Sequence, residues 1–220
     1  MPQFILSAVV SIARTTPSNV KGDFMVRVGF IGVPGCGKTS TARGLASSCR
    51  RLEEFQNVEL STEYARRYIA KYGAITQCWE QYRILNKQLD WEETVGKVDM
   101  TITDSPIFMS FMYAQQLCDG SPKDVMIVND IFSALNKLNN PTKRYDVIFF
   151  VPPILKPVAD GIRSDIQFNQ KWREEANQHL LALTRIFAPQ TLHMLTAVDL
   201  PARVDECITV LKEVSNASCR

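Results

Sequence analysis

One octapeptide limits the possible folds of this chain more than any other feature. Residues 32–39, Gly-Val-Pro-Gly-Cys-Gly-Lys-Thr, satisfy the pattern G-x-x-x-x-G-K-[ST] at every fixed position. The run before it, Met25–Ile31, is apolar like a buried parallel strand, and Thr39–Cys49 after it is rich in Ala, Leu and Ser like a helix. A glycine-rich turn between a strand and a helix predicts a loop that binds the phosphates of a nucleoside triphosphate.

Each fixed residue of the loop has a chemical task in that prediction. Gly35 and Gly37 let the backbone turn with its N–H groups pointing inward, where the helix N-terminus adds partial positive charge. Lys38 is expected to reach the β- and γ-phosphates of ATP, and Thr39 to offer its hydroxyl to Mg²⁺. The residues expected to contact the nucleotide are Gly32, Pro34, Gly35, Cys36, Gly37, Lys38, Thr39 and Ser40. The motif alone does not distinguish a kinase from a switch or a motor.

Length and charge narrow the class of protein. A chain of 220 residues fits one α/β domain, predicted over residues 25–220 after an N-terminal arm at residues 1–24. Its 25 basic and 23 acidic residues form no block of like charge, which favours a small-molecule acceptor over nucleic acid or a membrane surface. The apolar stretch Phe4–Ala13 is too short to span a bilayer and lacks the basic residues of a signal peptide.

The cysteines indicate a compartment. The chain has six of them, with no C-x-x-C pair and only two histidines that could join a zinc site. Free thiols in a reducing cytoplasm are therefore the interpretation we adopt. The sequence does not indicate an oligomeric state.

Strand-like and helix-like segments alternate along the chain. This alternation predicts an α/β fold of the P-loop NTPase type: a five-stranded parallel sheet flanked by helices, as in nucleoside and nucleotide kinases. Strands are expected at residues 25–31, 57–61, 98–103, 145–151 and 192–198. Helices are expected at residues 39–49, from about 62, and at 77–96, 108–117, 123–138, 171–187 and 201–215.

Charged residues follow two of the expected strands, where parallel sheets bind ligands. Asp104 ends the third strand and suits an aspartate that holds Mg²⁺ together with Thr39, although a helix N-cap is the alternative. Glu63 follows the second strand and could accept the proton of a substrate hydroxyl, although a solvated first-turn glutamate is the alternative. Arg66 and Arg67, on the next helix, could meet a phosphate, and at least one is expected to be an ordinary surface residue.

A lid segment is predicted after the fourth strand. Residues 156–170 are polar and contain Asp160-Gly161-Ile162-Arg163-Ser164, a turn with an arginine near its end. Phosphoryl transfer depends mostly on positioning and charge neutralisation, so a mobile segment that delivers Arg163 over the γ-phosphate has a clear task. A plain polar loop is the alternative.

These motifs together resemble the nicotinamide riboside kinase domain of NadR-type proteins. The similarity extends from about Met25 to Val214 and rests on the phosphate-binding loop, Glu63-Tyr64-Ala65-Arg66-Arg67-Tyr68, Thr103-Asp104 and the turn at residues 160–164. The resemblance implies Mg-ATP-dependent phosphorylation of a nucleoside-like hydroxyl. It implies Lys38 and Thr39 at the phosphates and Mg²⁺, Glu63 and Asp104 on the acceptor side, and Arg163 in the lid.

The chain departs from that family at two points. The family has Asp-x-Asp at the third strand, whereas Pro106 stands in place of the second acid, and Asp104-Ser105-Pro106 is instead similar to deoxynucleoside kinases. The length also leaves no room for the adenylyltransferase domain that often accompanies the family. The acceptor therefore stays open among nicotinamide riboside, a deoxynucleoside or nucleotide, and a hydroxymethylated pyrimidine in DNA, as in related phage kinases. Four aromatic residues could stack on a flat base, although helical aromatics are more often core: Trp79, Tyr82, Phe108 and Tyr113.

A nucleotide-driven switch or motor is the competing class. A GTPase has Asp-x-x-Gly after the third strand, but Asp104 is followed by Ser-Pro-Ile. Residues 136–139, Asn-Lys-Leu-Asn, are superficially similar to a guanine-reading motif yet fall in a helical pattern. A motor ATPase usually has a catalytic glutamate where Ser105 stands. A kinase is therefore favoured.

Overall fold

The chain folds around a parallel sheet, as predicted. The structure, a computed structural model, describes residues 25–61, 64–138, 144–153, 169–188 and 191–218. Five parallel strands pair in the order β2-β3-β1-β4-β5. Their bounds are β1 Val26–Ile31, β2 Val58–Ser61, β3 Met100–Thr103, β4 Val147–Phe150 and β5 Leu192–Met194.

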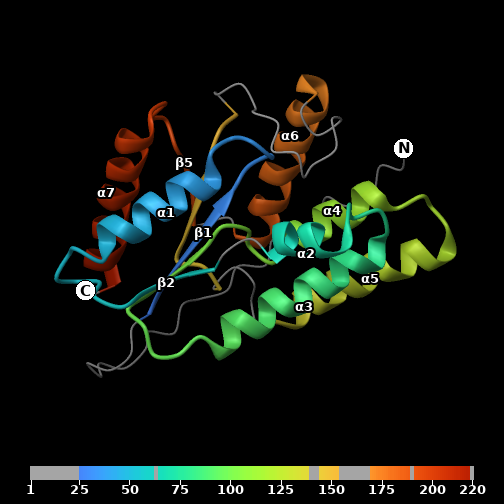
Figure 1. The fold of residues 1–220 in the computed structure, drawn as a ribbon, viewed down its shortest axis with the longest axis horizontal. Coiled ribbons are helices and arrows are strands. Elements are labelled where there is room, and N and C mark those ends of the chain that lie inside the picture. Colours follow the sequence, from blue (N-terminus) through green and yellow to red (C-terminus); the bar gives the residue numbers. More distant parts are fainter. Residues whose placement is uncertain (1–24, 62–63, 139–143, 154–168, 189–190, 219–220) are drawn as a thin grey trace.

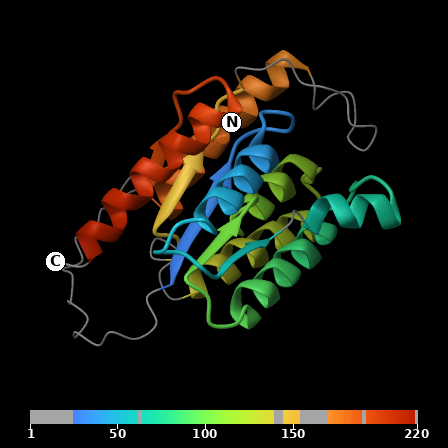
Figure 2. The same cartoon turned by 60° about the vertical axis from the view of Figure 1, so that its left-hand side comes forward.

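Helices cover both faces of the sheet (Figures 1 and 2). One face carries α1 and α7, which pack against each other, and the other carries α3, α4 and α5, with α6 beside α4. Their bounds are α1 Lys38–Cys49, α2 Tyr64–Tyr72, α3 Cys78–Thr94, α4 Met109–Leu117, α5 Pro122–Lys137, α6 Gln170–Phe187 and α7 Leu200–Ser218. Because helices cover both faces, the inner strands are buried on both sides: every residue of β3 and β4 is buried.

Strand β1 lies at the centre, and the position of its end determines where ligands can bind. The chain runs from β1 to β2 and β3 on one side and then crosses to β4 and β5 on the other. In open parallel sheets the crevice at such a reversal is the ligand site. The loop at residues 32–37 begins there, so the topology agrees with its predicted role.

Gly29 of β1 makes room for the segment that follows β3. A Cβ atom at position 29 would lie 2.8 Å from Cγ of Pro106, closer than such atoms approach. Pro106 is itself buried. The absence of a side chain at one position therefore allows the proline ring at the other.

The fifth strand is shorter than the sequence predicts. It ends at Met194, and one further ladder bond follows, from Leu195 N to Phe150 O at 3.0 Å. The amides of Thr196 and Ala197 instead donate to the carboxylate of Glu206 on α7, at 3.0 to 3.1 Å. The prediction of a strand to Val198 was wrong because a side chain on α7 takes the hydrogen bonds that a ladder would have used.

A buried polar network joins α3 to the segment after β3. The hydroxyl of Tyr145 donates to Glu92 Oε1 at 2.8 Å and accepts from the backbone amide of Ile107 at 3.0 Å. Arg144 also pairs with Glu92. Burial raises the pKa of Tyr145 well above its ordinary value, so the hydroxyl stays protonated and can donate. The network fixes the chain only three residues beyond Asp104.

We expect Tyr145→Phe to lower the free energy of unfolding by about 1–3 kcal/mol, because it leaves a buried amide and a buried carboxylate oxygen without a partner. Urea denaturation of the full chain measures the change. Tyr82→Phe is the matched control, since the Tyr82 side chain is exposed and its loss of a hydroxyl should change little. Equal stability of the two variants would contradict the network's contribution.

Candidate functional site

The predicted phosphate-binding loop has the backbone that its glycines imply. It leaves β1 at Gly32, with φ of +146°, and enters α1 at Gly37, with φ of +97°. A Cβ atom at Gly32 would lie 2.6 Å from the carbonyl oxygen of Val151, at the end of β4. Gly37 is the N-cap of α1 and has no side chain to cap the helix, so the first backbone amides of α1 suit an anion.

Lys38 lies along this loop. Its side chain is buried, and Nζ donates to the carbonyl oxygens of Gly32 at 2.7 Å and Val33 at 3.3 Å. The ammonium group is therefore held beside the first two residues of the loop. A cation in this position adds to the positive potential of the helix N-terminus.

Thr39 and Asp104 meet at the edge of the sheet. Strand β3 pairs with β1, so the residue after β3 faces the first turn of α1. The hydroxyl of Thr39 donates to Asp104 Oδ2 at 2.6 Å, and Asp104 is only 1% exposed. The N-cap alternative for Asp104 was wrong, because α4 starts at Met109 with Phe108 as its N-cap. The structure thus brings together the two residues that the sequence assigned to Mg²⁺.

Two buried arginines hold the loop from the far end of the chain. Arg173 on α6 donates from Nη1 to the carbonyl oxygen of Pro34 at 2.6 Å. Arg203 on α7 donates from Nη1 to the carbonyl oxygen of Cys36 at 3.1 Å and from Nε to that of Ala197 at 2.9 Å. Their exposed fractions are 5% and 2%. Both helices therefore determine the shape of the loop.

Each guanidinium has spare donor capacity at the loop. Among the residues that the structure describes, Nη2 of Arg173 and Nη2 of Arg203 are buried and make no hydrogen bond. Burial lowers the pKa of Arg173, but a guanidinium stays charged at any physiological pH. A buried cation with a free donor beside a glycine-rich loop suits a phosphate oxygen.

Neither Arg173 nor Arg203 was among the site residues predicted from the sequence. A signal was present in both helices. Arg173 falls on the apolar stripe of α6 that contains Ala176 and Leu180, and Arg203 precedes Val204 and Cys207 on the buried side of α7. A basic residue on the buried stripe of an amphipathic helix needs a polar partner inside the protein, and here the partner is the loop.

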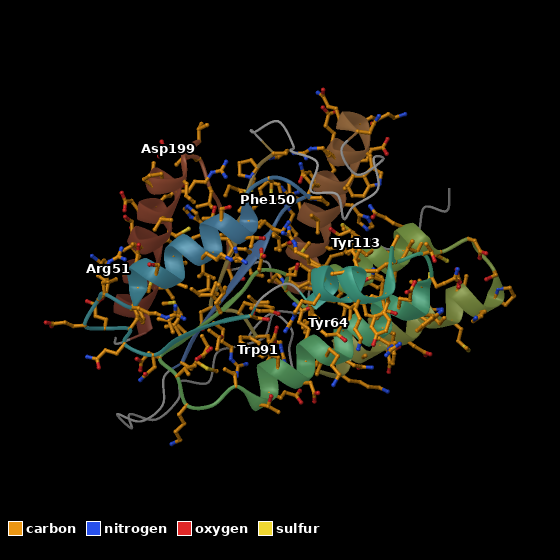
Figure 3. The ribbon with its side chains drawn as sticks, viewed as in Figure 1. Arg51, Tyr64, Trp91, Tyr113, Phe150 and Asp199 are labelled. Carbon is orange, nitrogen blue, oxygen red and sulfur yellow. The ribbon has the colours of Figure 1, made fainter. Side chains whose placement is uncertain are left out.

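The remaining predicted site residues have different outcomes. Glu63 and Arg163, like the N-terminal arm and most of the predicted lid, lie outside the described residues. Arg67 is exposed and its guanidinium lies over the ring of Tyr64, as expected for one of the two adjacent arginines. Phe108 is core, stacked on Phe187 of α6. The other aromatic candidates are half-buried or exposed, and Figure 3 shows Tyr64 and Tyr113 among the side chains around α2 and α4.

Glu206 fixes the connection between β5 and α7 that leads to Arg203. Its carboxylate accepts from the amides of Thr196 and Ala197 and pairs with His193 Nε2 at 3.2 Å. Burial alone opposes ionisation, but the hydrogen bonds outweigh it and lower the pKa of Glu206 below its ordinary value of 4.5. A carboxylate with a lowered pKa stabilises the fold above pH 4.5, and this contribution is lost as the pH falls through the folded-state pKa.

We therefore expect Glu206→Gln to cost roughly 1–2 kcal/mol of unfolding free energy near neutral pH, since an amide has one acceptor oxygen where the carboxylate has two. The difference from the original protein should shrink as the pH is lowered below 4.5. Chemical denaturation at several pH values measures it, with the exposed Glu213→Gln as control. A difference that grows in acid would contradict the assignment.

Comparisons with known proteins identify a family and similar folds. A family model described as an AAA domain matches residues 27–202. None of the curated proteins matches the sequence. Among solved structures, the NadR protein in complex with NR matches with a TM-score of 0.68 at 20% identity, over 88% of this chain and 52% of that one. This chain thus spans about half the length of the NadR chain.

Two kinases share the fold over almost their full length. Thymidylate kinase from Ehrlichia chaffeensis matches with a TM-score of 0.53 at 19% identity, over 86% of this chain and 98% of that chain. Deoxyadenosine kinase from M. mycoides, with products dCMP and a flexible dCDP bound, matches with a TM-score of 0.56 at 14% identity, over 86% and 100%. Within the described part of this chain, no helix has both the length and the apolar character needed to cross a bilayer.

Proposed function

Because this chain belongs to the AAA domain family, we propose that it binds Mg-ATP and transfers the γ-phosphoryl group to a hydroxyl of a nucleoside-like or nucleotide-like small molecule. The observation that carries the proposal is the hydrogen bond between Thr39 and Asp104, beside a glycine-rich loop that holds Lys38. A buried acid at the end of the neighbouring strand is unnecessary for a simple strand-to-helix turn, whereas phosphoryl transfer needs a metal-side carboxylate at that point.

Thr39 and Asp104 fit Mg²⁺. Both offer oxygen ligands, which this cation prefers, and their oxygens lie 2.6 Å apart. Mg²⁺ is commonly held by one or two protein oxygens together with substrate phosphates and water, so a larger cluster of acids is not required. When bound, Mg²⁺ neutralises negative charge on the triphosphate.

The loop and three cations account for binding of the triphosphate. The first amides of α1 and the ammonium group of Lys38 attract the phosphate oxygens. Arg173 and Arg203 keep the loop in shape through the carbonyl oxygens of Pro34 and Cys36, and each has a further buried donor. Fixed cations of this kind stabilise the charge that moves during transfer at little cost in reorganisation.

The proposal also gives roles to Glu63, on the acceptor side, and to Arg163, in the lid. In the sequence, Glu63 comes two residues after β2, the strand that pairs with β3. In this proposal Glu63 accepts the proton of the attacking hydroxyl, and Arg163 acts from a lid over the γ-phosphate. The nucleoside-like acceptor is supported by the fold shared with thymidylate kinase and deoxyadenosine kinase.

A nucleotide switch receives no support from the described residues. Asn136 and Lys137 lie in the last turn of α5, a surface helix, rather than at the carboxyl edge of the sheet where a guanine-reading motif acts. The experiment that separates the two classes measures ADP formation from Mg-ATP with and without candidate acceptors. The candidates are nucleosides, nucleotides and nicotinamide riboside, and Lys38→Ala provides the background rate.

We expect at least one acceptor to stimulate ADP formation and to gain a phosphate that mass spectrometry detects. If ATP is hydrolysed at the same rate with each acceptor as without any acceptor, the result would instead indicate a switch. The measurement needs no knowledge of the natural substrate, because stimulation above the acceptor-free rate is itself the result.

A further inference from the structure

The surface of α2 and the first turns of α3 is unusually basic. Residues 64–83 contain four basic side chains and one acid, Glu80, whereas the whole chain has a net charge of only +2. Glu80 is buried and accepts from the hydroxyl of Tyr68 and the amides of Thr76 and Gln77, so its carboxylate is not part of the exposed surface. Positive charge is therefore concentrated on this part of the molecule.

Exposed aromatic rings lie among these cations. Tyr72 is 55% exposed, and Trp79 and Tyr82 are 39% and 38% exposed. They lie on the short helix α2 and the adjoining end of α3, which project to the right in Figure 2. Large aromatic side chains seldom face solvent together on an uncovered surface unless they meet a partner. We call the set Arg67, Lys71, Tyr72, Trp79, Tyr82 and Arg83 the α2–α3 surface.

Contacts between cations and rings connect much of the α2–α3 surface through the buried ring of Tyr68. Tyr72 lies 4.8 Å from the ring of Tyr68, and Nζ of Lys71 lies 4.9 Å from the ring of Tyr72. The guanidinium of Arg83 lies 5.8 Å from the rings of both Tyr68 and Trp79. Among the described residues, Arg67, Lys71 and Arg83 pair with rings and with no acid. Their charge remains available to an anionic partner.

We propose that the α2–α3 surface binds single-stranded nucleic acid. A single strand presents a row of phosphates and unstacked bases, and proteins bind it with basic grooves in which bases stack on aromatic side chains. Here Lys71, Arg67 and Arg83 neutralise phosphates while Tyr72, Trp79 and Tyr82 offer faces to the bases. A duplex hides its bases, and an anionic membrane has no planar groups to stack, so the alternation of rings and cations favours a single strand.

The binding is separate from the proposed phosphoryl transfer. The residues of the α2–α3 surface are not in the loop at residues 32–39 and do not include Asp104, Arg173 or Arg203. A failure of one proposal can thus be distinguished from a failure of the other, because Lys38→Ala removes transfer and should leave binding of the strand unchanged.

The test is fluorescence anisotropy of the full chain with a labelled oligothymidylate of about 20 nucleotides, long enough for one site. Binding should weaken as salt rises, and Lys71→Ala should reduce the slope of log affinity against log salt by about 0.7, the value for one contact with a single strand. Tyr72→Ala and Trp79→Ala should each weaken binding by about tenfold through loss of stacking. Tyr72→Phe, which keeps the ring, should bind nearly as well as the original protein.

Matched controls lie on other helices. Lys212→Ala removes an exposed lysine from α7, and Met126→Ala removes a side chain on α5 that is 58% exposed, close to the value for Tyr72. Neither should change the affinity. Circular dichroism of each variant shows whether it folds, and substitutions at exposed positions usually change stability little.

Three outcomes would overturn the proposal. One is the absence of oligothymidylate binding at low salt. Another is equal affinity for inorganic polyphosphate of matched charge together with no effect of Tyr72→Ala, since charge alone would then explain the binding. The third is binding to vesicles that contain phosphatidylserine but not to the oligonucleotide, which would identify the surface as a membrane contact.

Discussion

Lys38→Ala is expected to lower kcat for phosphoryl transfer by at least 10²–10³-fold, roughly the loss seen when a fixed group that stabilises transition-state charge is removed. The ammonium group lies over the loop, held by the carbonyl oxygens of Gly32 and Val33. Alanine leaves nothing to take its place at the β- and γ-phosphates. Acceptor-dependent ADP formation at saturating ATP measures the loss.

The control for this variant concerns folding, because Lys38 is only 6% exposed and bonds to the loop. Its burial means that the substitution also lowers the stability of the fold. Lys38→Met keeps most of the buried volume. If this variant has the melting temperature of the original protein and a kcat as low as that of Lys38→Ala, the loss of activity is due to the missing charge. Unchanged turnover in either variant would contradict the role of Lys38.

Asp104→Asn is expected to raise the Mg²⁺ concentration for half-maximal activity by about tenfold or more, which corresponds to about 1.4 kcal/mol of lost metal affinity. Asparagine can still accept the hydrogen bond from Thr39, which spans 2.6 Å, so the substitution removes charge and keeps geometry. Activity titrated with Mg²⁺ at fixed ATP measures the shift, and high Mg²⁺ should restore much of the rate.

Glu63→Gln provides the contrast, because the proposal assigns the two carboxylates different roles. A general base contributes about 10²–10⁴-fold, so kcat should fall by that order while ATP binding stays nearly intact. The acidic limb of the pH profile should flatten, and Mg²⁺ should not restore the rate. Rescue of Glu63→Gln by Mg²⁺, with no rescue of Asp104→Asn, would exchange the two roles.

The fold could be predicted because its signals are local. Each of the five strands lies within a few residues of its predicted bounds. The strand after Phe187 was the least accurate prediction, since Thr196 and Ala197 have a strand-like sequence but bond to Glu206. That carboxylate lies ten residues further along the chain, and no local pattern reveals it.

The site was predictable only where residues are adjacent to a strand end. Asp104 follows β3 directly, so its meeting with Thr39 follows from strand order. Arg173 and Arg203 reach the loop from helices that come more than 130 residues later, 139 and 167 residues from their partners. The charge totals of the sequence also did not reveal the basic α2–α3 surface. They include Glu80, the acid of this region, which is buried in the fold.

The contact between Gly29 and Pro106 restricts how this sequence can evolve. Any residue larger than glycine at position 29 meets the proline ring, at 2.8 Å even for a Cβ atom. Replacing Pro106 with aspartate, the residue that NadR-type domains have there, would bring a carboxylate to a buried position beside Gly29. A Pro106→Asp variant is therefore expected to be less stable unless a nearby position first supplies a partner for the carboxylate. We expect substitutions at positions 29 and 106 to occur together rather than independently.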